Sequence, residues 1–175
     1  MRNKALRELC ILSVFAALLL IIKEVMAALP NIEGVSLLIV LCTVFFGWKA
    51  LLPVAAFIVI EGVLYGFGFW FPFYCIIWPL LVALTMLFRK LLKARVWAWT
   101  VFLGLFGLLF GMVYALTLFP TGGWSLVWSA YGSGLTFDLL HAGGNLVLAA
   151  MLFFPLYRIL QRLTTRNEAP IIKNE

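Results

Sequence analysis

Three polar residues share one face of a predicted helix in an otherwise apolar stretch. Asp138, His141 and Asn145 lie within residues 136–145, which contain the sole aspartate and the sole histidine of the sequence. On an α-helix, spacings of three and seven residues bring the three side chains to one side. Ionisable groups in an apolar helix usually face a cavity or a partner, so this face is the first candidate for acid–base chemistry or ligand contact. The alternative is a structural hydrogen bond from His141 to Asp138 or to a neighbouring helix.

The composition indicates a membrane protein. Of the 175 residues, 65% are hydrophobic and 11% are charged, whereas a soluble domain carries about 25% charged residues. The length allows about six spans of roughly 20 residues with short loops, and leaves no room for a separate soluble domain. The three cysteines are scattered without metal-ligand spacing, and we interpret them as small apolar residues.

Apolar runs and turn residues predict an all-α membrane protein with six transmembrane helices in one domain, residues 1–175. The expected spans are about 5–28, 35–46, 50–65, a fourth that ends at 88, 96–119 and 134–156. Residues 66–72 are expected to form a loop or re-entrant corner, residues 120–123 a turn, and residues 124–131 an interfacial or re-entrant piece. Residues 164–175 are polar and are expected to form a flexible cytoplasmic tail.

The basic residues predict the orientation of these spans. Twelve of the thirteen Lys and Arg residues precede the first span, lie after the second and fourth spans, or follow the sixth. Lys and Arg accumulate on the cytoplasmic side of membrane proteins, so both termini are expected in the cytoplasm of a multi-pass membrane protein. The net charge of +6 is then a topology signal that allows contact with anionic lipid. It does not indicate nucleic-acid binding.

The acidic residues within the spans are expected in their outer half. At 1.5 Å per helical residue, Glu61 lies about 18 Å from Lys49, and Asp138 lies roughly 30 Å from Arg158. Polar residues through the whole depth, as in a channel, are not seen. The pattern favours a cavity that is open to the outside and closed towards the cytoplasm.

Aromatic residues gather at the same predicted level, in residues 65–78 and 124–131. They form either an interfacial aromatic belt or the apolar walls of a ligand cavity. For Glu61, the alternative to a ligand contact is a structural ion pair with Lys23.

Motifs for catalysis are absent from the sequence. It contains no Gly-x-x-x-x-Gly-Lys-Ser/Thr loop, no His-Glu-x-x-His, no Gly-x-Ser-x-Gly and no paired cysteines. We therefore expect no ATP hydrolysis by this chain, no enzymatic activity and no intrinsic cofactor. A lone histidine without a second histidine or a cysteine gives little support to a metal site.

Three stretches, together with the six-helix architecture, resemble the substrate-binding S components of energy-coupling factor (ECF) transporters. These stretches are residues 28–38 (ALPNIEGVSLL), 61–68 (EGVLYGFG) and 137–141 (FDLLH) with Asn145. The chain is most similar to the cobalamin-specific S component, over nearly its full length. The resemblance implies a protein that binds a vitamin, cobalamin or another corrinoid, from outside. It then docks on a transmembrane T component that carries two ATPase subunits, and topples in the membrane to release the ligand.

The resemblance also assigns residues to binding and docking. Docking in that family uses an Ala-x-x-x-Ala pattern on the first helix, which here reads Ser13-Val-Phe-Ala-Ala17 and implies docking by Ser13, Ala16 and Ala17. Small residues four apart let any helix approach closely. In a corrinoid complex, aromatic rings would cover the flat ring and polar groups would meet its amides. The expected substrate-binding residues are Asn31, Glu33, Glu61, Tyr65, Trp70, Tyr74, Trp124, Asp138, His141 and Asn145.

Two other functions remain open from the residues alone. The first is a proton-coupled small-molecule carrier with a relay through Glu61, Asp138 and His141, which would drive uptake without a partner. The second is a membrane scaffold or assembly protein whose polar face binds another helix, and which would bind a protein partner and no small ligand.

Overall fold

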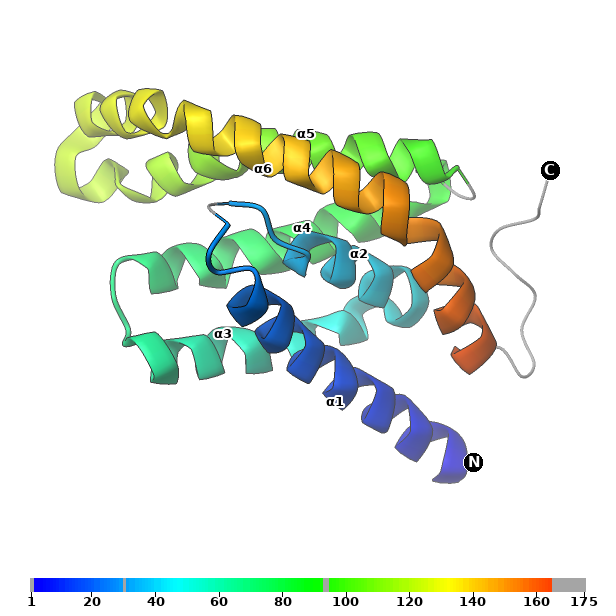
Figure 1. Cartoon of the computed structure of the whole chain (residues 1–175). Coiled ribbons are helices and arrows are strands. Elements are labelled where there is room, and N and C mark those ends of the chain that lie inside the picture. Colours follow the sequence, from blue (N-terminus) through cyan, green and yellow to red (C-terminus); the bar gives the residue numbers. More distant parts are fainter. Residues whose placement is uncertain (1, 30, 93–94, 165–175) are drawn as a thin grey trace.

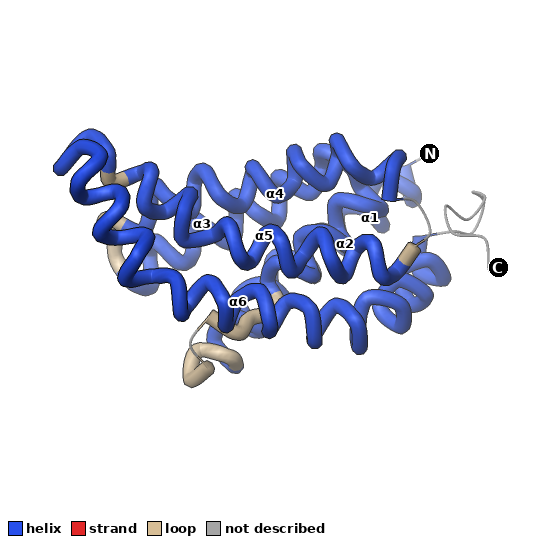
Figure 2. The backbone as a smooth tube through the Cα atoms, turned by 90° about the horizontal axis from the view of Figure 1, so that it is seen from above, coloured by secondary structure: helices blue, strands red, loops and turns tan. Residues whose placement is uncertain are grey.

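Over the residues that the structure describes, the chain folds into helices joined by short turns. The structure is a computed structural model that describes residues 2–29, 31–92 and 95–164. Figure 2 shows helices joined by short loops and no strand in this part of the chain. The helices are α1 (Arg2–Val25), α2 (Val35–Phe46), the short 3-10 helix η1 (Gly47–Ala50), α3 (Leu51–Tyr65), α4 (Trp70–Leu92), α5 (Val96–Thr117) and α6 (Phe119–Thr164).

Five helical stretches among the described residues are long and apolar enough to cross a membrane. They are Ala5–Val25, Val35–Tyr65, Trp70–Leu92, Val96–Thr117 and Phe119–Thr164. The predicted all-helical class is confirmed, and the structure is compatible with a multi-pass membrane protein. The stretch Val35–Tyr65 folds back at η1, so that α2 and α3 run in opposite directions (Figure 1). With 12 and 15 residues, each is shorter than the roughly 20 residues of a full span; the count of six spans and the cytoplasmic placement of the termini stay predictions.

Successive helices reverse direction, so both ends of the described chain lie at the same end of the bundle (Figure 1). Arg7 in α1 donates a hydrogen bond to the carbonyl of Leu163 at the end of α6. Lys49 in η1 forms an ion pair of 2.8 Å with Glu8 at the start of α1. The turns at residues 66–69 and 118–123 lie at the opposite end, which we call the far end, and α1 ends in the same half of the bundle (Figure 1). The predicted tail lies outside the described residues, apart from Thr164, which ends α6.

The α5–α6 connection differs from the prediction. Residues 124–131 were expected as an interfacial or re-entrant piece before a span that begins at 134, but they are helical and continue into α6. Within α6, Gly123 has non-helical backbone angles, φ 60° and ψ −162°, so the reversal from α5 takes place within a few residues. Interior glycines such as those at 132 and 134 each disfavour a helix by about 1 kcal/mol. Packing of α6 along the whole of α5 outweighs that local preference.

The shortest α-helix lies at the centre of the bundle. Nine of the twelve residues of α2 are buried, because α1, α4 and α6 all pack against it. Large buried rings from the outer helices, including Trp78, Trp99 and Phe153, complete the core. Large apolar side chains such as Leu87 and Met151 are exposed on the outside. A contiguous apolar exterior of this kind fits a lipid environment.

Candidate functional site

A cluster of charged residues lies at the far end, where α1 ends. Lys23, in the last turn of α1, forms an ion pair of 2.7 Å with Glu33 of the following turn. Both are largely buried, with 29% of the Lys23 side chain and 8% of the Glu33 side chain exposed. The alternative pairing of Lys23 with Glu61 is not the one that forms.

A second polar contact joins α1 to α3. The hydroxyl of Tyr65, the last residue of α3, donates to the carboxylate of Glu24 and lies 2.7 and 2.6 Å from its two oxygens. Gly66 follows with a φ of 81°, which glycine adopts without strain and which ends the helix at this point. The contact is solvent-exposed, unlike the Lys23–Glu33 pair.

Glu61 is the most isolated acidic group at this end. It lies one turn before Tyr65 on α3 and is only 3% exposed. Its Oε1 atom is buried and has no hydrogen-bond partner among the described residues. A buried carboxylate oxygen without a partner is costly, so it marks a place where a partner from outside the chain is expected.

Aromatic rings of α4 form the apolar wall beside these carboxylates. Trp70 and Tyr74 pack edge to face with ring centroids 5.1 Å apart, and Tyr74 packs in the same way on Trp78 at 5.5 Å. The ammonium of Lys23 lies 5.9 Å from the centroid of the Tyr74 ring, within reach of a cation–π interaction.

These groups surround one cavity of about 400 Å³. It is lined by Lys23, Glu24, Ala27, Glu61, Tyr65, Trp70 and Tyr74. A cavity with apolar walls and a few polar anchors is suited to binding a small molecule. The described residues contain no group of three or more His, Cys, Asp or Glu side chains arranged to hold a metal ion.

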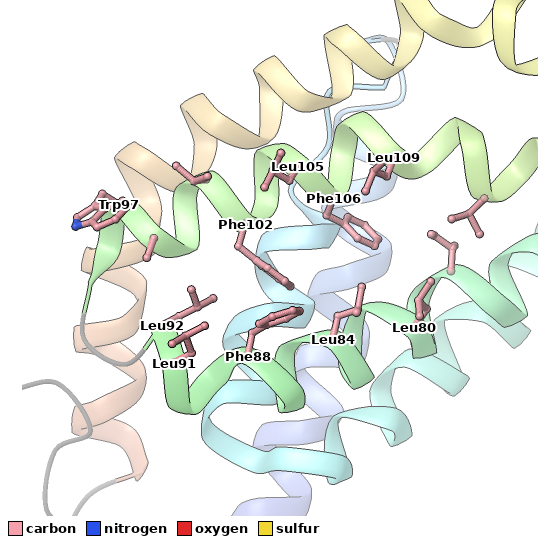
Figure 3. A pocket seen from close by; sticks show the side chains of 14 residues that line it. Leu80, Leu84, Phe88, Leu91, Leu92, Trp97, Phe102, Leu105, Phe106 and Leu109 are labelled. Carbon is pink, nitrogen blue, oxygen red and sulfur yellow. The ribbon is translucent and has the colours of Figure 1, made fainter.

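A second, larger hollow has a different character. It is a groove of about 500 Å³ between α4 and α5, and all fourteen residues that line it are apolar or aromatic. Figure 3 shows leucine and phenylalanine side chains, among them Leu84, Phe88 and Phe102, on its walls. Several of its residues, such as Leu91 and Leu105, are exposed on the outer surface of the bundle. The groove offers no polar anchor, so the candidate site is the smaller cavity at the far end.

The predicted polar face of α6 packs against α5. The backbone N–H of Gly111 donates to Oδ1 of Asp138 at 2.8 Å, and Nδ2 of Asn145 donates to the carbonyl of Leu103 at 3.0 Å. Both α6 side chains are 2% exposed. Neither lines the cavity, and both tie α6 to the backbone of α5.

His141 lies between these two contacts and is 1% exposed. Its Nε2 atom lies 3.5 Å from the hydroxyl of Ser36 on α2, and its ring packs edge to face on Phe110 with centroids 4.6 Å apart. The Nδ1 atom of His141 and the Oδ2 atom of Asp138 are buried without partners among the described residues. The structure therefore contains no hydrogen bond between His141 and Asp138.

The ten residues predicted to bind substrate thus separate into groups. Glu61, Tyr65, Trp70 and Tyr74 line one cavity, and Glu33 joins it through Lys23. Asp138, His141 and Asn145 lie between helices, as described above. The other two are Asn31, in the turn before α2 with a φ of 55°, and Trp124, 57% exposed and packed on Trp128 and Phe119.

Sequence reasoning named Lys23 as a possible ion-pair partner of Glu61, and it omitted both Lys23 and Glu24 from the binding set. The signal that points to them is a charged pair within an apolar run. Such a pair requires polar partners nearby, and both residues line the cavity.

The predicted docking residues lie on the outside of α1. Ser13 and Ala17 are exposed and Ala16 is partly exposed, whereas Leu12, Phe15 and Leu19 face the core. The hydroxyl of Ser13 donates to the carbonyl of Leu9 at 3.0 Å, so it presents no free donor to a partner. This face is accessible to another helix.

Comparisons with protein-family models, with curated proteins and with solved structures find no match.

Proposed function

We propose that this chain is the substrate-binding S component of an ECF-type importer. The observation that carries the proposal is the cavity of about 400 Å³ at the far end, with carboxylates on one side and aromatic rings on the other. In this proposal a small molecule binds there from outside the cell. The sequence has no nucleotide-binding loop, so a separate T component with two ATPase subunits supplies the energy.

The position of the cavity supports dependence on a partner. The core on its inner side is apolar and closely packed, with Leu41, Leu81, Leu103 and Phe153 all fully buried. A polar ligand has no continuous polar path through such a core. Release on the other side then requires movement of the whole protein or of its helices, which docking to a partner would drive. The small residues on the outer face of α1 provide a surface for that docking.

The volume of the cavity limits the size of the substrate that it can hold. Small-molecule pockets span about 300–1,000 Å³, and about 400 Å³ is near the lower end. A vitamin or precursor of one or two rings fits this space. Cobalamin or another corrinoid, the substrate implied by the resemblance, requires α1 and the turn between α3 and α4 to move apart.

Binding and uptake test the proposal separately. Detergent-purified protein is analysed by native mass spectrometry for a co-purifying small molecule, and by absorbance for a corrinoid spectrum. Uptake of the identified molecule is then measured in cells that express the chain with and without a T component and its ATPases. We expect a bound small molecule, and uptake only with the partners. When a residue that lines the cavity, such as Glu61, is substituted, Glu8→Gln at the opposite end of the bundle is the matched control. Tight binding of a protein partner with no small ligand would instead support the scaffold hypothesis.

A proton-coupled carrier is the second candidate, and one specific observation favours it. Glu61, Asp138 and His141 each have a buried polar atom without a partner among the residues that the structure describes, as groups that take up and release protons often do. Uptake by the purified chain alone in proteoliposomes, driven by a proton gradient, would support this function over the first.

A further inference from the structure

The far-end cavity contains more acidic groups than basic ones. Lys23 is the only basic residue among those that line it, and Glu33 already neutralises it at 2.7 Å. Glu24 and Glu61 add two further carboxylates. With one ammonium and three carboxylates ionised, these four residues carry a formal charge of −2. The net charge of the site therefore bears on whether a cationic, a neutral or an anionic ligand binds best.

The two unneutralised carboxylates differ in their surroundings. Glu24 is solvent-exposed and accepts a hydrogen bond from Tyr65, so water and a tyrosine satisfy it. Glu61 is 3% exposed, and its Oε1 has no partner in the part of the chain that the structure describes. A buried carboxylate binds a hydrogen-bond donor strongly, and a charged donor most strongly. Glu61 is therefore the buried carboxylate of this cavity for which the described residues supply no hydrogen-bond donor to Oε1.

The aromatic wall favours the same kind of ligand. Trp70 and Tyr74 line the cavity next to Glu61, and the faces of such rings attract cations. The Tyr74 ring already has an ammonium, that of Lys23, 5.9 Å from its centroid. A flat ligand can pack on these rings while its charged edge meets the carboxylate.

We propose that the ligand of this cavity is a flat organic cation with N–H donors, and that Glu61 binds its charged group. The inference rests on the proposed function, because it takes the cavity to be a small-molecule site. Amidinium groups and protonated amino-substituted nitrogen rings belong to this class. A carboxylate or phosphate ligand would instead add negative charge beside Glu24 and Glu61, with Lys23 already paired. A neutral ligand would leave the charge of Glu61 uncompensated.

Three probes of nearly equal shape test the charge directly. Benzamidinium, benzamide and benzoate carry charges of plus one, zero and minus one on the same ring. Their binding to the full-length detergent-purified protein is followed by tryptophan fluorescence, since Trp70 lines the cavity. We expect benzamidinium to bind at least about tenfold more tightly than benzamide, because its hydrogen bond to Glu61 is charge-assisted, and benzoate not to bind. Equal or tighter binding of benzamide or benzoate overturns the proposal.

Two variants test whether Glu61 is the residue that binds the charged group of the ligand. Glu61→Gln keeps the size of the side chain and removes its charge, so we expect the preference for benzamidinium over benzamide to fall to about equal affinity. Glu8→Gln removes a carboxylate of the Lys49 ion pair at the other end of the bundle, and we expect the preference to persist. An unchanged preference in Glu61→Gln overturns the role of this residue. The wild-type comparison of the three probes does not depend on whether that variant folds.

The identity of a co-purifying molecule separates this inference from the proposed function. Mass spectrometry of the small molecule released from the wild-type protein gives its charge class. A released organic cation supports the inference. A released neutral or anionic molecule overturns the inference and leaves the proposed function intact. No released molecule, together with no binding of any probe, overturns both.

Discussion

Gly107 on α5 packs directly against the backbone of α6. A Cβ atom at residue 107 would lie 2.8 Å from the backbone nitrogen of Ala142 and 2.9 Å from the carbonyl carbon and oxygen of His141. Ordinary van der Waals contacts of such an atom are 3.4–4 Å. We predict that Gly107→Ala pushes the two helices apart by several tenths of an ångström and destabilises the protein.

The expected size follows from two opposing effects. Extra methyl groups in a packed core cost about 1–3 kcal/mol, and a clash with backbone belongs to the upper part of that range, since no side chain can rotate away. Alanine improves the local helix preference by up to about 1 kcal/mol. The net loss is then about 1–2 kcal/mol. For a chain of this size that lowers the unfolding midpoint by roughly 2–8 °C.

Gly143→Ala is the matched control on the facing helix. Nothing lies within 4 Å of the Cβ position at residue 143, so only the gain in helix preference remains. We expect this variant to unfold at the same temperature as the wild type or slightly above it.

Thermal unfolding of the three detergent-purified proteins, followed by far-ultraviolet circular dichroism at one scan rate, measures the difference. We expect the unfolding midpoint of Gly107→Ala to lie below that of the wild type. The midpoint of Gly143→Ala should equal or exceed that of the wild type. If Gly107→Ala unfolds at or above the wild-type midpoint, the close approach of α5 and α6 is refuted.

Three further outcomes are expected. Lys23→Met leaves the carboxylate of Glu33 buried without its 2.7 Å partner, so the free energy of unfolding should fall by about 1–3 kcal/mol. In the same denaturation assay, the additional substitution Glu33→Gln should recover part of this loss. Asp138→Ala removes the acceptor for the Gly111 N–H and should lower the free energy of unfolding by about 1 kcal/mol. The variant should still bind ligand in a fluorescence titration, and abolished binding would place Asp138 in the site. Trp124→Ala should leave ligand affinity unchanged in the same titration, because the ring is 57% exposed and outside the cavity; a weakened affinity would contradict this.

The helical class was predictable from the sequence because hydrophobicity is a property of composition and local runs. Pro30 and residues 66–69 separate apolar runs in the sequence, and the structure turns at residues 26–29 and 66–69. The α5–α6 reversal was predicted less well. Residues 124–131 were expected as an interfacial or re-entrant piece, but the long-range packing of α6 on α5 keeps them in one helix with the predicted sixth span.

Part of the candidate site was predictable because several of its residues are close together in the sequence. Glu61, Tyr65, Trp70 and Tyr74 lie close together in sequence on two helices joined by a short turn, so their proximity follows from local order. Lys23 and Glu24 enter the cavity from α1, and that contact depends on how α1 packs on α3.

By itself, the sequence determined the all-helical class, the approximate helices that are long and apolar enough to cross a membrane, and the gathering of polar and aromatic residues towards one end. These follow from the number and order of apolar and charged residues along the chain. The tertiary structure alone decided which polar groups meet. Lys23 pairs with Glu33 and leaves Oε1 of Glu61 without a partner in the described part of the chain, while Asp138 and Asn145 form hydrogen bonds to the backbone of α5 instead of facing a cavity. The physical reason is that hydrogen bonds and ion pairs form only within about 3–4 Å, and the distances between helices are set by packing, here by the glycines of α5.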